Sequence, residues 1–154
     1  MAFDAKRLQA KHRYVFQDVF EWTGKFRTVN ISKSGDPFAF REYIVPTLNK
    51  TFEDLRNERY LSGSDAETFA RRAAYYLGEI NAIHPFREGN GRTQREFIRQ
   101  FAARSGLLIE WTRISQEQII EDSRRSLRID NLGLEDILRT ALTSPGAPPA
   151  SSPS

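Results

Sequence analysis

Apolar side chains recur at helical spacing along most of this chain. Side chains three and four positions apart lie on one face of a helix, so the pattern predicts helices that pack against a common core. The predicted helices cover residues 3–22, 46–55, 64–83, 92–104, 115–127 and 134–142. The segment 64–83 is dense in Ala, Phe, Tyr, Leu and Ile, which indicates a central, largely buried helix. The fold class that follows is a mainly α-helical bundle.

Cap residues define the ends of several of these helices. Ser64 with Glu67 matches a capping box, in which the Ser64 hydroxyl accepts a hydrogen bond from the Glu67 backbone amide. Ser115 with Gln118 repeats the same pattern. Gly106 predicts a left-handed stop after the helix that ends near residue 104.

One stretch between the first two helices breaks the helical pattern. Residues 26–32 are rich in β-formers, and residues 34–37 have the turn sequence Ser-Gly-Asp-Pro. Phe38 and Phe40 then alternate around Ala39. This pattern predicts one small β-hairpin, in which the two phenylalanines either pack against the hairpin or contact a partner.

The length and composition limit what the chain can be. A chain of 154 residues suits one domain, and 39% hydrophobic with 28% charged residues is typical of a globular protein. From residue 144 onward the chain contains only Pro, Ser, Ala and Gly, which offer no large apolar side chain for packing. We therefore expect one domain over residues 1–143 and a disordered tail or linker over residues 144–154.

Several functional classes are disfavoured. The chain has no cysteine and two histidines, so it has neither a disulfide framework nor a thiolate zinc site. A net charge of +3 does not require a nucleic-acid partner. No apolar run approaches the roughly 20 residues of a membrane span, and the first ten residues lack the apolar centre of a signal peptide. The expected location is the cytoplasm, with no membrane or nucleic-acid partner.

The segment 84–95, His-Pro-Phe-Arg-Glu-Gly-Asn-Gly-Arg-Thr-Gln-Arg, joins two predicted helices and contains the candidate chemistry. The first amides of a helix lack intrahelical partners and favour a negative charge. Gly89 and Gly91 let backbone N–H groups converge on an anion. Arg92 and Arg95 are three residues apart, so both can face it, and guanidinium groups match phosphate oxygens in pairs. The pattern predicts a phosphate-binding site.

Two further residues suggest what happens at that phosphate. Glu88 would repel phosphate unless it holds a hard cation such as Mg²⁺, which takes one or two protein carboxylates together with substrate phosphates. His84 is a base beside the predicted anion site, with an ordinary pKa of roughly 6.5. In isolation, His84 could instead be a helix-capping core histidine. Arg99 continues the arginine run, and we expect it on a solvated face; His12 is expected to be structural or exposed.

The segment 84–95 matches the signature of the Fic family, His-x-Phe-x-Asp/Glu-Gly-Asn-Gly-Arg-x-x-Arg, at every defined position. Residues 20–29, Phe-Glu-Trp-Thr-Gly-Lys-Phe-Arg-Thr-Val, also resemble the stretch that leads into the hairpin of this family. The resemblance covers roughly residues 5–142. It implies the Fic fold, a helical bundle with a β-hairpin, the flap, beside the active site.

The resemblance also implies residue roles for AMP transfer from ATP to a Ser, Thr or Tyr hydroxyl of a target protein. His84 would deprotonate the hydroxyl, Glu88 would hold Mg²⁺, and Arg95 would act both in binding and in stabilising the departing pyrophosphate. The flap, residues 32–40 from Ser32 to Phe40, would align the target by strand addition. The residues that would bind the nucleotide are Gly89, Asn90, Gly91, Arg92 and Arg95, with the Asn90 side chain near the α-phosphate.

Two comparisons within the family refine this expectation. A phosphorylating branch, Doc, has lysine where this chain has Gly91, so Gly91 favours AMP transfer. Many members carry a helix with the pattern Ser/Thr-x-x-x-Glu-Gly/Asn, whose glutamate blocks an active-site arginine. No such pattern occurs here, because the one Glu followed by Gly or Asn is Glu88 itself. Either a separate small antitoxin supplies the glutamate, or the domain is of the uninhibited effector kind.

Alternatives to AMP transfer remain open from the sequence. The donor could supply a phosphoryl, UMP or phosphocholine group instead. A non-catalytic nucleotide- or protein-binding module is the third hypothesis, and the intact His84, Glu88 and Arg95 argue against it. Toxin-like members of the family act on bacterial enzymes in the cytoplasm, whereas effector-like members are delivered into a host cell; the sequence does not name the target.

Overall fold

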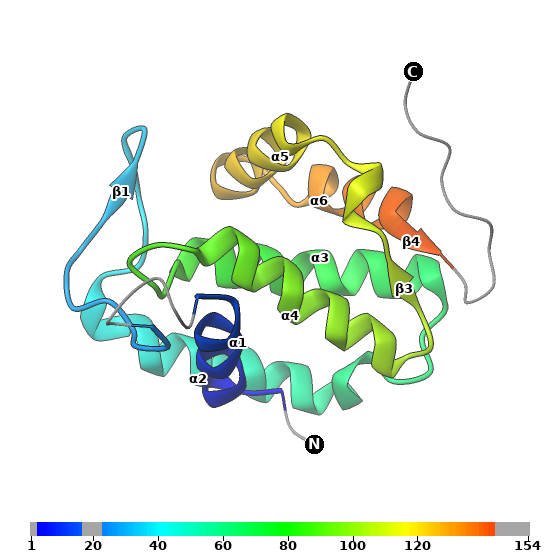
Figure 1. The fold of residues 1–154 in the computed structure, drawn as a ribbon, viewed down its shortest axis with the longest axis horizontal. Helices are drawn as coiled ribbons and strands as arrows, with labels where there is room; N and C mark the ends of the chain where they lie inside the picture. Colours follow the sequence, from blue (N-terminus) through cyan, green and yellow to red (C-terminus); the bar gives the residue numbers. More distant parts are fainter. Residues whose placement is uncertain (1–2, 17–22, 144–154) are drawn as a thin grey trace.

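The computed structural model describes residues 3–16 and 23–143, and helices dominate this part of the chain (Figure 1). Three short 3₁₀ helices, η1 (Arg41–Tyr43), η2 (Arg59–Leu61) and η3 (Trp111–Arg113), lie between longer ones. The α-helices are α1 (Ala5–Phe16), α2 (Ile44–Asn57), α3 (Ala66–Ile83), α4 (Asn90–Arg104), α5 (Gln116–Arg128) and α6 (Leu132–Ala141). The mainly helical prediction is therefore confirmed.

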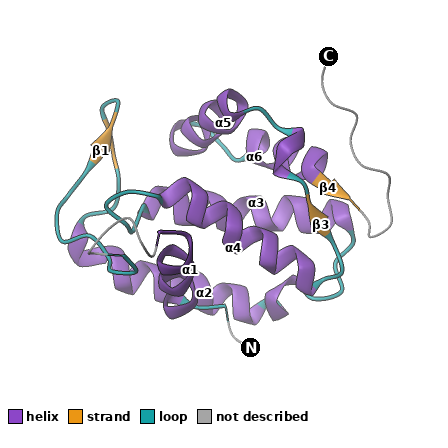
Figure 2. Ribbon diagram, in the orientation of Figure 1, coloured by secondary structure: helices purple, strands orange, loops and turns teal. Residues whose placement is uncertain are grey.

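Helix α3 is the centre of the bundle. It packs against α2, α4, α5 and α6, and Figure 2 shows α5 and α6 on one side of it and α2 on the other. Ala70, Ala73 and Ala74 are fully buried, and such small side chains allow neighbouring helices to approach closely. Phe69 is also inaccessible to solvent and contacts Phe101 of α4, with ring centroids 5.4 Å apart. The expected central, buried helix is confirmed.

The helix ends agree with the sequence in some places and differ in others. Ser115 caps α5 as predicted, because its hydroxyl accepts from the Gln118 backbone amide at 3.1 Å. The Ser64 cap was wrong: Asp65 is the N-cap of α3 and accepts from the Thr68 amide at 2.7 Å. A carboxylate is a stronger acceptor than a hydroxyl, so the cap lies one residue later.

Other helix bounds shift by a few residues. Helix α4 begins at Asn90, two residues before the predicted start, and α6 begins at Leu132 instead of residue 134. The positive φ of 74° at Gly106 confirms the left-handed stop beyond α4. Residues 17–22 of the first predicted helix and the predicted tail, 144–154, lie outside the described residues.

The flap contains a β-hairpin that is shorter than expected. Strands β1 (Ser32–Lys33) and β2 (Asp36–Pro37) pair antiparallel, and the turn between them has positive φ at both Ser34 and Gly35. Such a two-residue turn matches the twist of the flanking strands. Residues 26–31 and 38–40 were predicted as strands, which was wrong, because part of their backbone bonds to the end of α3 instead of to a facing strand.

A second antiparallel pair closes the opposite end of the molecule. Strand β3 (Leu108–Ile109) pairs with β4 (Leu142–Thr143), in the register Leu108 with Thr143 and Ile109 with Leu142. The sequence pattern did not predict it, because each strand has two residues and Leu142 follows the helical spacing of α6. In the described parts of the chain, no helix has the length and apolar character required to cross a bilayer.

Candidate active site

A cavity of about 360 Å³ lies between the flap, the segment 84–95 and helices α3, α5 and α6. Its lining contains every residue of the segment 84–95 that the sequence singled out for catalysis or for nucleotide and metal binding. These are His84, Glu88, Gly89, Asn90, Gly91, Arg92 and Arg95. The flap contributes Lys33, Asp36 and Phe38, and α5 contributes Arg124. The structure thus brings together residues that lie far apart in the sequence.

The loop that carries the signature is closed by its own side chains. Both polar atoms of the Asn90 side chain bond to Phe86: Oδ1 accepts from the Phe86 amide at 2.9 Å, and Nδ2 donates to the Phe86 carbonyl at 2.7 Å. Phe86 is 1% exposed, so it anchors the loop in the core. Asn90 therefore stabilises the loop, and its contact with a phosphate stays a prediction.

The backbone at the start of α4 forms a concave surface for an anion. Gly89 has φ of 80°, a left-handed conformation that residues with a Cβ rarely adopt. A Cβ at this position would also lie 2.3 Å from the Phe16 ring. At Gly91 a Cβ would meet Nη1 of Arg95 at 3.2 Å. Glycine is thus required at the first position by backbone and space, and at the second it leaves room for Arg95.

Arg92 and Arg95 both line the cavity, and neither forms an ion pair within residues 3–16 and 23–143. The pKa of Arg95 is lowered, first by burial and then by the neighbouring charge of Arg92. The guanidinium of Arg92 lies 5.2 Å from the centre of the Phe16 ring. Two cations that repel each other in one cavity are favourable for binding a polyanion.

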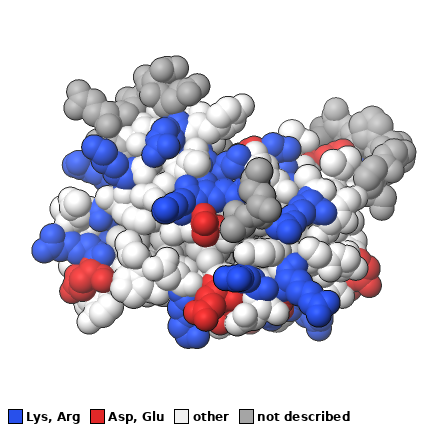
Figure 3. Space-filling model, turned by 90° about the horizontal axis from the view of Figure 1, so that it is seen from below, with Lys and Arg blue, Asp and Glu red and all other residues white. Residues whose placement is uncertain are grey.

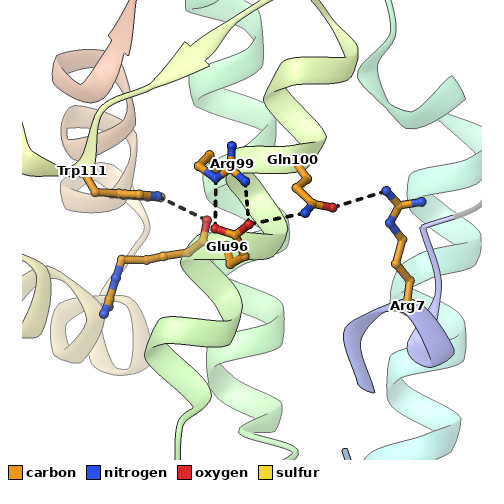
Figure 4. Close-up of polar contacts among 6 residues, drawn as sticks. Arg7, Glu96, Arg99, Gln100 and Trp111 are labelled. Carbon is orange, nitrogen blue, oxygen red and sulfur yellow. Dashed lines mark hydrogen bonds and ion pairs between the residues drawn. The ribbon is translucent and has the colours of Figure 1, made fainter. Parts of the chain in front are cut away.

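Arg99 does not belong to this group, as expected. It is exposed and forms a bidentate pair with Glu96 on the same helix, with nitrogen–oxygen distances of 2.6 and 2.9 Å (Figure 4). Figure 4 also shows the indole of Trp111, whose Nε1 donates to the Arg95 carbonyl at 3.2 Å. Trp111 thus holds the turn of α4 that carries Arg95, and it also packs against the hydrophobic core.

His84 caps the C-terminus of α3 with φ of 50° and lines the cavity. The Phe38 ring of the flap stacks on its imidazole, with centroids 3.8 Å apart and planes 10° apart. Its Nδ1 is buried and makes no hydrogen bond to residues 3–16 or 23–143. The pKa of His84 is lowered to about 4, first by burial and then by the charges of Lys33 and Arg27, while the dipole of the Asn81 carbonyl opposes this. His84 is therefore neutral near pH 7, as a base must be.

Glu88 is exposed at the cavity, while its backbone carbonyl accepts from Nε2 of His12 at 2.8 Å. Within the described ranges, no three His, Cys, Asp or Glu side chains gather in a way that could hold a metal ion by themselves. A lone carboxylate suits Mg²⁺, which fills most of its shell with water and phosphate oxygens. The donor set at Glu88 thus fits a Mg²⁺ ion that arrives with a nucleotide.

Two buried side chains beside the signature were not identified as functional from the sequence. His12 is 0% exposed, which confirms a structural role over an exposed one. Arg27 is 5% exposed, and its guanidinium bonds to backbone carbonyls that include that of His84. Arg27 lies inside the segment 20–29 that resembles the family, and this position was the one signal that could have identified it.

Charge on the outer surface shows no comparable concentration in the view of Figure 3. On that face, Lys and Arg side chains are spread across the surface, and acidic side chains lie among them. Arg125 pairs with Asp130 at 3.0 Å. Arg92 and Arg95 of the cavity have no such carboxylate partner among the described residues.

Comparisons with known proteins agree with this geometry. A model of the Fic/DOC family matches residues 2–102. The chain is 40% identical over 141 residues to the protein adenylyltransferase VbhT of Bartonella schoenbuchensis, which covers 92% of this chain and 30% of VbhT. It is 34% identical over 139 residues to the probable protein adenylyltransferase Fic of Escherichia coli, covering 90% of this chain and 70% of that protein.

Solved structures share the fold. The N-terminal Fic domain of a VirB-translocated Bep effector protein from Bartonella quintana, with bound ADP, matches with a TM-score of 0.89 at 27% identity, covering 93% of this chain and 74% of that one. The chain spans 30% of the length of VbhT, so it corresponds to one part of that longer relative. The family match, the signature and the helical bundle with its flap agree, and the chain belongs to the Fic/DOC family.

Proposed function

We propose that this chain transfers AMP from ATP to a Ser, Thr or Tyr hydroxyl of a target protein and releases pyrophosphate. The observation that carries the proposal is the cavity in which a neutral His84 faces two arginines without ion-pair partners among the described residues. The relatives named protein adenylyltransferases support it. Gly91 supports AMP transfer over phosphoryl transfer, because the phosphorylating branch of the family has lysine at this position.

In the proposed reaction, His84 accepts the proton of the target hydroxyl. The hydroxyl oxygen then forms a bond to the α-phosphorus, and the bond between that phosphorus and the bridging oxygen to the β-phosphate breaks. Pyrophosphate leaves with the electron pair, and Arg92 and Arg95 stabilise its charge. The backbone amides of Gly89, Asn90 and Gly91 bind the phosphates at the N-terminus of α4.

Glu88 would hold a Mg²⁺ ion together with phosphate oxygens. Such an ion, when bound, neutralises charge on the phosphates and thereby favours departure of pyrophosphate. The negative charges of the bound nucleotide also favour the protonated form of His84, so they raise its pKa from about 4 toward neutrality. The base would therefore become stronger when its co-substrate is present.

The flap would dock the target by adding a strand to the exposed edge of the hairpin. Ser32 and Lys33 of β1 are exposed, whereas Phe38 is 6% exposed and packs on His84. Phe40 is 54% exposed. The two phenylalanines therefore have different proposed roles, since Phe38 orders the base and Phe40 is available to a target.

Regulation follows from the free arginines. No carboxylate pairs with Arg92 or Arg95 in the described residues, so the domain is proposed to be active unless a glutamate is supplied by a separate antitoxin. Residues 1–143 would form the catalytic domain, and residues 144–154 a tail or linker. The protein would act either as a toxin in the cytoplasm or as an effector in a host cell.

The test is to incubate purified protein with cell lysate, Mg²⁺ and labelled ATP, and to identify the modified protein by mass spectrometry. Addition of one AMP unit supports the proposal, whereas a UMP, phosphocholine or phosphoryl adduct selects one of the alternatives. A parallel sample with excess chelator should lose the label, because without a cation the carboxylate of Glu88 repels the phosphates. Full labelling in chelator would remove Mg²⁺ from the mechanism.

A further inference from the structure

Arg27 has an unusual set of partners for a buried cation. It is 5% exposed, and its guanidinium donates to four backbone carbonyls. Nε donates to the His84 carbonyl at 2.8 Å, and Nη1 to the Val29 carbonyl at 2.8 Å. Nη2 donates to the Ile83 carbonyl at 3.0 Å and also to the Ala39 carbonyl. No carboxylate forms an ion pair with it in the described residues.

The position of these carbonyls explains how a charge is tolerated there. Ile83 is the last residue of α3 and His84 is its C-cap, so their carbonyls lie where the helix dipole is negative and where intrahelical donors are lacking. A guanidinium has five N–H groups in one plane and can serve several carbonyls at once. Arg27 therefore completes the C-terminus of the central helix.

The same side chain also joins both ends of the flap to that helix. Val29 lies three residues before the flap, and Ala39 lies near its end. Two backbone bonds reinforce the connection: the Arg27 amide donates to the Pro85 carbonyl at 2.9 Å, and the Ala39 amide donates to the Ala82 carbonyl at 3.2 Å. Both ends of the flap are thus tied to the turn that carries the base.

We propose that Arg27 is a positioning residue that holds the flap and His84 in a fixed relation. This inference rests on the proposed function, in which the flap presents the target and His84 takes its proton. Strand addition places the target hydroxyl relative to the flap, so its distance to the imidazole depends on how the flap is attached. Misplacement of reacting groups by about 1 Å can cost on the order of 100-fold in rate.

The first test replaces Arg27 with glutamine and, separately, with lysine. We expect transfer to the target to fall by about 100-fold in kcat/KM, while affinity for a non-hydrolysable ATP analogue with Mg²⁺ is unchanged, because the loop 84–95 stays closed by Asn90. Lysine retains the charge but cannot reach both flap ends and α3 together, so it should not rescue the rate.

A matched control is available in Arg41→Gln. Arg41 is exposed, and its Nη1 donates to the Thr28 carbonyl at 3.0 Å, near the same end of the flap but without a bond to α3. Its replacement should leave transfer within about twofold, since exposed polar contacts contribute little. Full transfer by Arg27→Lys, or an equal loss in Arg27→Gln and Arg41→Gln, would overturn the inference.

Hydrogen exchange separates this inference from the proposed function, because it requires no transfer. In Arg27→Gln, the amides of Phe38 and Ala39 should exchange at least tenfold faster, while amides in the middle of α3 and α4 are unchanged. If this pattern appears and the unaltered chain transfers no AMP, the proposed function fails and the attachment of the flap by Arg27 stands. Unchanged exchange at Phe38 and Ala39 would reject the inference that Arg27 attaches the flap to α3.

If the Arg27 variants do not fold, the unaltered chain still provides a test. Native-state exchange should show that the amides of Arg27, Ala39 and His84 open together, because they bond to Pro85, Ala82 and Ile80 around one guanidinium. A common opening equilibrium supports the inference. Opening of Ala39 at a much lower denaturant concentration than His84 would show that the flap moves independently and would overturn it.

Discussion

The environments of the two histidines, His12 and His84, are alike in packing and different in hydrogen bonding. Each imidazole lies flat against a phenylalanine: His12 on Phe86 with centroids 4.0 Å apart, and His84 on Phe38 with centroids 3.8 Å apart. In both cases burial is the first cause of a lowered pKa. Stacking and burial therefore do not distinguish the structural His12 from His84, for which we propose a catalytic role.

The ring nitrogens make the distinction. The Gly24 amide donates to Nδ1 of His12 at 2.9 Å, so the ring proton must be on Nε2, which donates to the Glu88 carbonyl at 2.8 Å. Both nitrogens of His12 are thus used to join α1, the segment before the flap and the signature loop. Within the described part of the chain, Nδ1 of His84 has no hydrogen-bond partner, and the ring lines the cavity. A histidine with an unpartnered ring nitrogen in this cavity is the one that we propose for proton transfer.

The largest effect should come from His84→Ala. We expect transfer to fall by 10²- to 10⁴-fold, the range typical of a lost general base, with unchanged affinity for an ATP analogue. Labelling of the target by the purified variant and calorimetric binding of the analogue are the two measurements. If the His84→Ala variant still labels the target, His84 is not the base, and the proposed difference in role between the two histidines is wrong.

His12→Leu should show the opposite pattern, a loss of stability. The Gly24 amide and the Glu88 carbonyl would both lose a buried partner, at about 1–3 kcal/mol each. Urea denaturation should therefore show a decrease of about 2–6 kcal/mol in the free energy of unfolding. His12→Gln keeps a donor and an acceptor and serves as the matched control with a smaller loss. A stable His12→Leu protein would mean that these two bonds contribute nothing.

The pH dependence of stability should contain a contribution from His84 that its substitution removes. Its folded pKa of about 4 is below the unfolded value of about 6.5, so the unfolded chain binds more protons in this window. Stability should therefore rise with pH from 4 to 6.5, and His84 should account for about 2 kcal/mol between pH 5 and pH 6.5. Urea denaturation at pH 5 and pH 6.5 should show a smaller change in the free energy of unfolding for His84→Ala than for the unaltered chain. An identical change in the two proteins would contradict this prediction.

The smallest effect should come from Arg99→Ala, which extends the contrast to the arginines. Arg99 is exposed and already paired with Glu96, so its removal should change stability by less than about 0.5 kcal/mol and leave transfer unchanged. Arg95→Ala, its counterpart one turn earlier, should weaken binding of an ATP analogue. If Arg99→Ala and Arg95→Ala weaken binding of the ATP analogue equally, the ion pair with Glu96 does not mark Arg99 as a surface residue without a role in the site.

The sequence alone was sufficient for the features that depend on local chemistry. Helical periodicity located the α-helices, Ser115 identified a true cap, and the glycines and arginines of residues 84–95 proved to line one cavity. These features arise from contacts within a few residues, which spacing and residue type report directly. The order of residues therefore determined the bundle, the signature loop and its family.

Tertiary structure decided the features whose partners are distant backbone groups. His12 bonds to a carbonyl 76 residues away, and Arg27 bonds to one 57 residues away. Every residue has a backbone carbonyl, so the sequence does not indicate to which carbonyl a buried side chain will donate a hydrogen bond. The short strands of the flap have the same cause, since the Ala39 amide finds its acceptor at Ala82 of α3. Only the packing of α3 against the flap selects these partners, and with them the position of the base.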